Sequence, residues 1–191
     1  MGKGPSVNHL VISVRDLEAS HRFYTEVLGF EQCGEMTHTM KMRFYRGSED
    51  SHHDLALAET GNPSAYGPPP EWSLIHMPPG INHVAIAYED RETWLERLKA
   101  IKAKGVDFKI RGNHGMTHSA YITDHDGNGI EVLYNLPAEV WSGDVDAALN
   151  YFEFLPNDGD AAFEDPTDYQ HFGPGHGKAE AVEGRIVAKV D

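Results

Sequence analysis

The sequence predicts an α+β fold made of two copies of a βαβββ unit that pair into one domain. Two observations point to the duplication. The dipeptide Asn8-His9, at the start of an apolar stretch, returns as Asn82-His83, 74 positions later. Asp16 and Asp90 stand the same distance apart, and each comes directly before a segment with apolar residues at helical spacing. Agreement at several separate points favours an internal repeat over coincidence.

The first copy spans about residues 7–58. Residues 7–14 are rich in β-branched and apolar residues and predict a strand. In residues 17–28 apolar side chains recur at helical spacing, between an aspartate that suits the N-cap and a glycine, Gly29, that suits the C′ position. Three further strands are expected at residues 30–35, 39–46 and 54–58.

The second copy spans about residues 81–135 and follows the same order. A strand is expected near residues 81–88, and a helix over residues 91–104 that Gly105 ends. The sequence Asp126-Gly127-Asn128-Gly129 supplies residues that tolerate a tight turn before a last apolar strand at residues 130–134. The two helix-ending glycines stand 76 positions apart. If this offset continues, Tyr121 corresponds to Tyr45 and Glu131 to Leu55.

Residues 59–80 and 137–191 lie outside the repeats. Residues 59–80 contain many prolines and glycines and are expected to form a linker or a lid. Residues 137–191 are acidic and rich in proline and glycine, and they are expected to form an arm or a tail. Aromatic clusters such as residues 151–154 favour an arm that lies along the repeats or along a neighbouring subunit.

Composition excludes several classes of partner. The formal net charge of the 191-residue chain is −14, whereas nucleic acids and anionic membranes require a basic surface. No apolar run approaches the 18 residues of a membrane-spanning helix. The single cysteine, Cys33, cannot form an internal disulfide, which favours a reducing cytoplasm. We expect no nucleic-acid or membrane partner, and association into a homo-oligomer.

Strand periodicity places three residues of the kinds that bind metals on equivalent strand faces. Side chains two residues apart share a face of a strand, so His9, His83 and Glu131 would converge if the two copies are related by a pseudo-twofold axis. Two imidazoles and one carboxylate form the facial triad of non-haem Fe(II) oxygenases. In the first copy, Leu55 would occupy the position of Glu131 and leave the metal with vacant sites. The alternatives are that the histidines are hydrogen-bonded core residues and that Glu131 faces solvent on an edge strand.

Several short motifs carry a resemblance to a known family. They are Asn8-His9, Phe23-Tyr24, Leu28-Gly29-Phe30, His52-His53-Asp54-Leu55-Ala56-Leu57, Asn82-His83, Tyr121 and Asp126-Gly127-Asn128-Gly129-Ile130-Glu131. Together they resemble the vicinal oxygen chelate superfamily and, within it, the type I extradiol catechol dioxygenases. The resemblance covers about residues 7–136. Most type I enzymes contain four such modules, so this chain resembles a single-domain form.

The resemblance implies an Fe(II)-dependent enzyme, with Mn(II) as a possible replacement, that inserts O₂ into a catechol-type aromatic diol. His9, His83 and Glu131 would bind the metal. His53 matches the acid–base histidine of the family and Tyr121 its hydrogen-bonding tyrosine. The family places a further histidine nine residues before that tyrosine, where this chain has Gly112. His114 is the expected replacement, and His118 is its rival.

Three other activities remain open on the same fold. A glyoxalase I-like isomerase would use a metal with four protein ligands. A hydroquinone-cleaving dioxygenase would keep the metal and change the ring chemistry. A binding module that sequesters antibiotics would need no metal triad.

Overall fold

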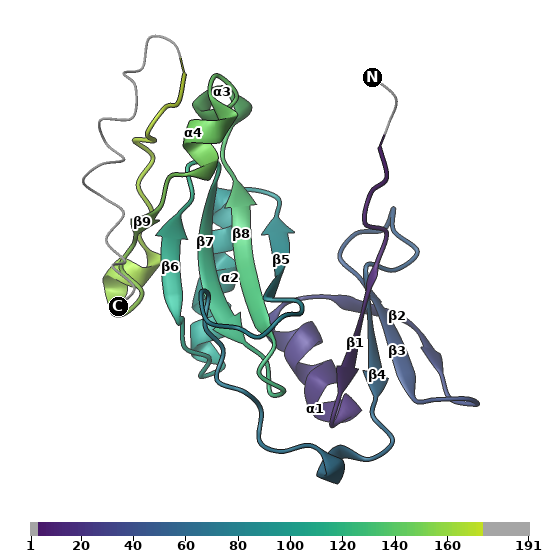
Figure 1. Cartoon of the computed structure of the whole chain (residues 1–191). Helices are drawn as coiled ribbons and strands as arrows, with labels where there is room; N and C mark the ends of the chain where they lie inside the picture. Colours follow the sequence, from purple (N-terminus) through teal and green to yellow (C-terminus); the bar gives the residue numbers. More distant parts are fainter. Residues whose placement is uncertain (1–3, 174–191) are drawn as a thin grey trace. The chain divides into compact units, whose positions relative to one another are not determined.

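The computed structural model describes residues 4–173, which divide into two compact units (Figure 1). Unit 1 comprises residues 4–72 together with the turn at residues 124–128. Unit 2 comprises residues 73–123 and 129–173. Each unit contains one sheet and one principal helix.

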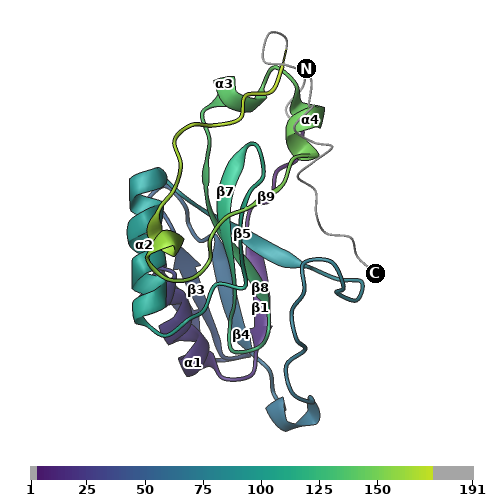
Figure 2. The ribbon, with the colours of Figure 1, turned by 90° about the vertical axis from the view of Figure 1, so that its left-hand side faces the viewer.

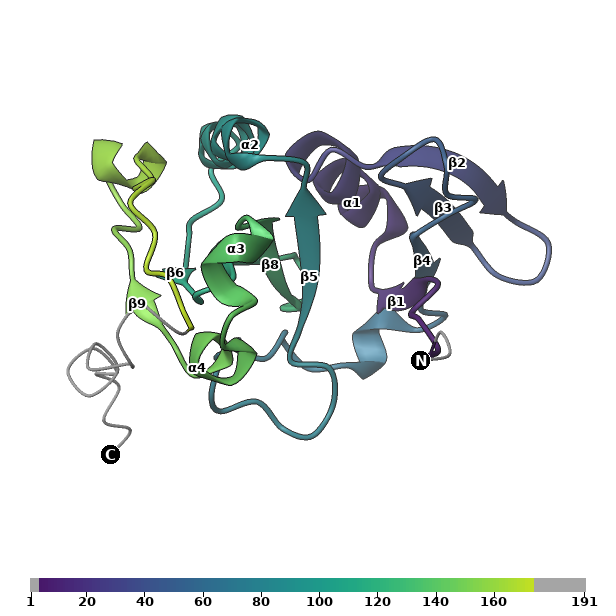
Figure 3. The ribbon, with the colours of Figure 1, turned by 90° about the horizontal axis from the view of Figure 1, so that it is seen from above.

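In unit 1 the sheet has the strand order β1-β4-β3-β2, with β1 parallel to β4 and the other pairs antiparallel. The strands are β1 (Leu10–Val14), β2 (Glu31–Met36), β3 (Met42–Arg46) and β4 (Leu55–Glu59). The helix α1 (Leu17–Arg22) continues as a wider π-helical turn, η1 (Phe23–Val27), and lies against β3 and β4 (Figure 3). A short 3₁₀ turn, η2 (Pro63–Ala65), interrupts the predicted linker.

Unit 2 repeats this connectivity. Its sheet has the order β5-β8-β7-β6-β9, with β5 parallel to β8 and the other pairs antiparallel. The strands are β5 (His83–Tyr88), β6 (Ile110–Asn113), β7 (Thr117–Thr123), β8 (Gly129–Asn135) and β9 (Glu153–Phe154). The helix α2 (Arg91–Ala103) lies against one face of this sheet (Figure 2). The predicted α+β fold of two βαβββ copies is therefore confirmed.

The helix signals in the sequence act as expected. The carboxylates of Asp16 and Asp90 accept hydrogen bonds from the backbone N–H groups of Ala19 and Thr93, at 2.9 and 2.8 Å. Each carboxylate satisfies one of the N–H groups that lack a partner at a helix start. Gly29 and Gly105 follow the helices with φ of 87° and 78°, a conformation that costs glycine little.

The predicted equivalence of Leu55 and Glu131 is wrong by one residue. In unit 1, Leu55 lies beside Tyr45 across the sheet, and the hydroxyl of Tyr45 is 3.2 Å from Nδ1 of His21 on α1. Leu55 therefore faces α1. In the pairing of β1 with β4, the residue opposite Val11 is Ala56.

In unit 2 the corresponding face is occupied by other residues. The ring of Tyr134 lies 5.1 Å from that of Trp94 on α2, so Tyr134 faces the helix. Glu131, three positions earlier in the same strand, faces the opposite way. In unit 2, Glu131 lies opposite Ala85. In unit 1, the residue that corresponds to Ala85 is Val11, and Val11 lies opposite Ala56. The residue of unit 1 that is equivalent to Glu131 is therefore Ala56. The sequence offset failed because a one-residue change in register moves every side chain to the other face of a strand.

Residues 137–173, which follow β8, belong to unit 2. They form α3 (Ala138–Trp141), α4 (Val145–Leu149), β9 and a 3₁₀ turn, η3 (Asp160–Phe163). The strand β9 pairs with β6, so this part of the chain adds a fifth strand to the sheet. We refer to residues 137–173 as the C-terminal segment. No helix within residues 4–173 is long and apolar enough to cross a membrane.

Candidate active site

The sheet face of unit 2 that is turned away from α2 carries three of the predicted site residues. Glu131 in β8 lies opposite Ala85 in β5 and opposite Tyr121 in β7. His83 shares the face of Ala85, two residues before it. We call this side of the sheet the site face. It brings together His83 and Glu131, as strand periodicity predicts, and Tyr121, which the family resemblance implies.

On the site face, the imidazole of His83 and the carboxylate of Glu131, both groups that can bind a metal, lie close together. Nε2 of His83 lies 3.2 Å from Oε2 of Glu131, while Nδ1 of His83 lies 2.9 Å from the side-chain oxygen of Asn82. Because that amide oxygen can only accept, Nδ1 of His83 donates, and in the neutral ring Nε2 is then an acceptor. Two acceptor atoms therefore face each other, and a proton or a cation between them would resolve the conflict. This donor set fits a divalent metal, since histidine ligands usually donate their other ring nitrogen to an oxygen.

His9 in unit 1 has the same local arrangement. Its Nδ1 lies 2.7 Å from the side-chain oxygen of Asn8, so its Nε2 is likewise the available acceptor. The repeated Asn-His dipeptide thus repeats a geometry as well as a sequence. Within residues 4–173, no group of three or more His, Cys, Asp or Glu side chains is arranged to hold a metal ion.

The carboxylate of Glu131 is buried and held by several partners. The hydroxyl of Ser119 donates to its Oε1 at 2.5 Å, and Nε2 of His114 lies 3.8 Å from the same oxygen. Burial raises the pKa of Glu131, but its contacts with His83 and Ser119 outweigh this effect, and the pKa is lowered overall. The group is therefore ionised at neutral pH, as a metal ligand requires.

His114 and Tyr121 form a hydrogen-bonded pair beside this carboxylate. The hydroxyl of Tyr121 lies 2.9 Å from Nε2 of His114. Burial, and then the charge of Glu131, raise the pKa of Tyr121, so it remains a phenol. Burial lowers the pKa of His114, which favours a neutral ring. A neutral imidazole next to a phenol can accept a proton from a bound substrate.

His118, the predicted rival of His114, lies elsewhere. It pairs with Tyr134 on the face that α2 covers, and its Nδ1 is 2.9 Å from Oδ1 of Asp165. Its side chain is 1% exposed. The structure therefore brings His114, and not His118, to Glu131.

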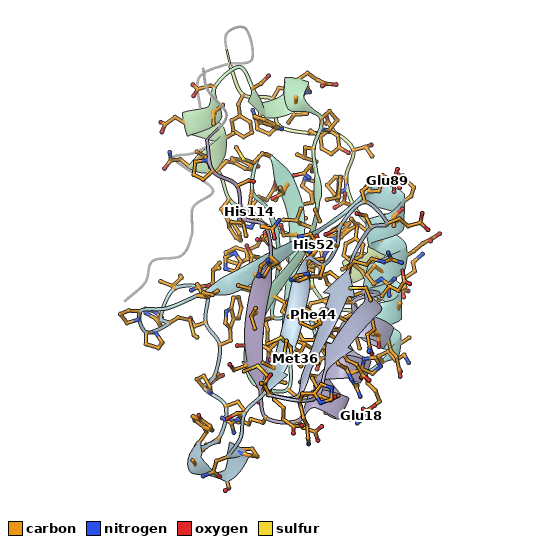
Figure 4. All side chains as sticks on the ribbon, turned by 90° about the vertical axis from the view of Figure 1, so that its right-hand side faces the viewer. Glu18, Met36, Phe44, His52, Glu89 and His114 are labelled. Carbon is orange, nitrogen blue, oxygen red and sulfur yellow. The ribbon has the colours of Figure 1, made fainter. Side chains whose placement is uncertain are left out.

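His53 lies in unit 1 beside His9. The two rings are 4.5 Å apart, and the ring of Phe44 is 5.2 Å from that of His53. Burial lowers the pKa of His53, and the neighbouring rings of His52 and His9 lower it further. His52 also lies beside His53: both residues precede β4, and their Nδ1 atoms are 2.7 Å apart. Figure 4 labels His52 and Phe44 in unit 1, and His114 in unit 2.

Sequence reasoning missed the residues that support the ligands. Ser119 stands two positions before Tyr121 in β7, so the same period-two argument could have placed it on the site face. The roles of Asn8 and Asn82 could have been read from the repeated dipeptide. The contact of Phe152 with His114, at 4.8 Å between ring centroids, left no sequence signal, since the two residues belong to different segments.

Comparison with known proteins shows the family to which the chain belongs. Residues 6–132 match the model of the Glyoxalase/Bleomycin resistance protein/Dioxygenase superfamily. The chain is 29% identical over 128 residues to biphenyl-2,3-diol 1,2-dioxygenase 2 of Rhodococcus globerulus, covering 67% of this chain and 62% of that protein. It is 29% identical over 138 residues to catechol-2,3-dioxygenase of Bacillus subtilis, covering 72% of this chain and 44% of the relative.

A relative with another activity matches over more of its own length. The chain is 26% identical over 141 residues to a probable lactoylglutathione lyase of Vibrio parahaemolyticus, covering 68% of this chain and 91% of the lyase. By contrast, the chain spans less than two thirds of the length of the two dioxygenases.

Solved structures agree on the fold. A glyoxylase/bleomycin resistance protein/dioxygenase domain from Frankia sp. superposes with a TM-score of 0.56 at 18% identity, covering 70% of this chain and all of that domain. A mutant of the fosfomycin resistance protein FosX from Listeria monocytogenes, complexed with Mn(II) and 1S,2S-dihydroxypropylphosphonic acid, gives 0.51 at 20% identity, with coverages of 71% and 95%. At this identity the likeness shows the fold alone. With its two βαβββ units and the family match over residues 6–132, the chain belongs to the glyoxalase/bleomycin resistance protein/dioxygenase superfamily, also called the vicinal oxygen chelate superfamily.

Proposed function

We propose that this protein is an Fe(II)-dependent extradiol dioxygenase that cleaves the ring of a catechol-type diol with O₂, both atoms of which enter the product. The observation that carries the proposal is the pair of His83 and Glu131, whose facing acceptor atoms lie 3.2 Å apart. The similarity to biphenyl-2,3-diol and catechol dioxygenases supports the choice of substrate class.

The proposed metal ligands are His83, Glu131 and, by its position in the repeat, His9. The separation of the first two allows both to reach one ion, since nitrogen and oxygen ligands lie about 2.0–2.2 Å from a metal such as zinc. When bound, the metal would supply Lewis acidity and lower the pKa of the diol hydroxyls. Fe(II) is the metal proposed and Mn(II) is the alternative, because affinity alone does not select between them.

The side chains of this protein have three proposed tasks. Ser119 holds the carboxylate of Glu131 in one orientation. His114 and Tyr121 bind and orient a substrate oxygen, with the neutral imidazole able to take its proton and the phenol able to donate a hydrogen bond. We propose that His53 transfers a proton during ring cleavage, since its lowered pKa keeps the ring neutral and able to accept one.

The charges near the site favour a neutral diol. Arg111, the arginine closest in sequence to His114, has its guanidinium 5.2 Å from the ring of Trp94 and lies in the buried layer between the sheet and α2. Arg111 therefore lies on the other side of the sheet from the site face, and it is not placed to bind a carboxylate on the substrate. We also propose a reducing compartment, because the single cysteine of the chain, Cys33, cannot form an internal disulfide.

A glyoxalase I-like isomerase is the second candidate, supported by the similarity to lactoylglutathione lyases. That chemistry uses four protein ligands, and unit 1 has Ala56 at the position equivalent to Glu131. The absence of a carboxylate at this position favours the dioxygenase. Hydroquinone cleavage would use the same three ligands, so a substrate panel has to distinguish it.

The test combines metal analysis with an oxygen electrode. We expect the purified protein to contain about one iron per chain and to consume O₂ in the presence of catechol. His83→Ala should lose both the iron and the activity, while His76→Ala, which changes an exposed histidine of unit 2, should keep both. Zinc or nickel content with activity on a hemithioacetal would instead support the isomerase. An active His83→Ala variant with full metal content would refute the proposed ligand set.

A further inference from the structure

The C-terminal segment reaches the site face at Gly112. In β6, Gly112 lies opposite Ser119, whose hydroxyl bonds to Glu131, so Gly112 also belongs to the site face. A Cβ atom at Gly112 would lie only 2.7 and 2.8 Å from two ring atoms of Phe152. The φ of Gly112 is not in the left-handed region, so the backbone does not require glycine there. Glycine is needed because the ring of Phe152 packs directly on the strand.

The same ring contacts the hydrogen-bonded pair of His114 and Tyr121. The ring of Phe152 lies 4.8 Å from that of His114, with 73° between the planes. Nε2 of His114 is in turn 2.9 Å from the hydroxyl of Tyr121. Phe152 is half-buried, so part of the residue remains accessible to solvent.

Backbone hydrogen bonds and a small apolar core fix the position of Phe152. The following residues form β9, which pairs with β6, and the N–H of Leu155 donates to the carbonyl of Arg111 at 2.9 Å. The preceding residue, Tyr151, is 3% exposed and packs with Ala148 and Phe172. The ring is therefore held on both sides by structured chain.

We propose that Phe152 is a specificity-determining residue, whose ring forms an aromatic wall beside His114 and limits the size of the ring substituent that the site accepts. The inference rests on the proposed function for its substrate class, an aromatic diol. Edge-to-face contact with a substrate ring favours aromatic ligands. The bulk of the side chain excludes a large substituent on the diol at this side.

The test compares catechol with biphenyl-2,3-diol, which carries a phenyl substituent next to the diol. Phe152→Ala should raise the ratio of kcat/KM for biphenyl-2,3-diol to that for catechol by about 10-fold or more, because small changes in pocket volume alter discrimination by about 10–200-fold. Phe152→Leu should give an intermediate ratio. Leu149→Ala is the control, since this apolar residue of the same segment is 68% exposed and lies in α4, outside the pairing of β9 with β6. Its ratio should stay within about 2-fold of the wild type.

The outcomes separate this inference from the proposed function. Turnover with an unchanged ratio in Phe152→Ala would overturn the role of Phe152 and leave the dioxygenase assignment standing. If Phe152→Ala does not fold, as circular dichroism would show, the ratio in Phe152→Leu decides. If the wild type turns over neither diol, the proposed function fails, and the ratio of the two dissociation constants, measured by calorimetry on the same variants, decides instead. A ratio that does not depend on residue 152, or no binding of either diol, would overturn the inference.

Discussion

The hydroxyl of Ser119 supports the proposed ligand Glu131. It donates at 2.5 Å to Oε1, while the other carboxylate oxygen, Oε2, faces His83. Groups that orient a metal ligand in this way typically change metal affinity by about 10–100-fold when they are removed. The bond therefore predicts a measurable effect on metal binding.

Ser119→Ala should weaken the binding of Fe(II) or Mn(II) by about 10-fold or more, because the carboxylate loses its fixed orientation. A competition titration against a chelator measures this affinity. Ser142→Ala, at an exposed serine of the same unit, should leave the affinity unchanged. Equal affinities in Ser119→Ala and the wild type would show that the hydroxyl does not orient a ligand.

A variant of His53 tests the proposed proton transfer separately from metal binding. His53→Ala should reduce turnover of a catechol by about 10²–10⁴-fold, the usual contribution of a general acid or base, while the iron content stays unchanged. The measurements are the initial rate of O₂ consumption and metal analysis of the same sample. His38→Ala, an exposed histidine of unit 1, is the control. Full activity of His53→Ala would exclude the proposed role.

The C-terminal segment is attached to unit 2 by a buried charge network. The side chain of its Asp165 is 0% exposed and accepts hydrogen bonds from His118 at 2.9 Å and Tyr134 at 2.6 Å, with Arg111 at 3.5 Å. A buried carboxylate without such partners would cost several kcal/mol. The network explains why an acidic, proline-rich segment packs against the sheet.

Asp165→Asn should destabilise the protein by about 3–5 kcal/mol, the usual cost of removing one partner from a buried ion pair, because Arg111 loses its counter-charge. The midpoint of urea unfolding measures the effect. Asp168→Asn, an exposed aspartate of the same segment, should change the midpoint little. A midpoint close to that of the wild type would show that the network does not stabilise the segment.

The same network predicts how the stability of the folded protein depends on pH. Burial raises the pKa of Asp165, but His118, Tyr134 and Arg111 outweigh it, so the pKa in the folded state is lowered. The resulting stabilisation is fully present above the unfolded value of about 3.9 and is lost as the pH falls through the folded pKa. The stability difference between the wild type and Asp165→Asn should therefore shrink below about pH 4.

At the scale of the whole molecule, the net charge of −14 dominates encounters with other polyanions. Proteins that bind nucleic acid non-specifically do so with dissociation constants of about 10⁻⁴–10⁻⁶ M. We expect no binding in this range to a labelled duplex at low salt, measured by fluorescence anisotropy with a basic protein as the positive control. Salt-dependent binding would contradict the exclusion of nucleic-acid partners.

Several features of the fold and the site were predictable because their signals are local. The caps at Asp16 and Asp90 depend on the residues within one helical turn. The pairing of His83 with Glu131 follows from strand period and from the repeat. The register of Leu55 was not predictable in this way, since a single extra residue in a loop moves a side chain to the other face.

The sequence by itself determined the duplicated βαβββ architecture, the capped helices and the placement of His83 and Glu131 on one face of a sheet. Only the tertiary structure decided that His114 rather than His118 accompanies Glu131, that Ala56 occupies the equivalent position in unit 1, and that Phe152 packs on Gly112. The physical reason is that periodicity and capping act over a few residues along the chain. Register and the docking of the C-terminal segment depend instead on contacts between segments that are distant in sequence.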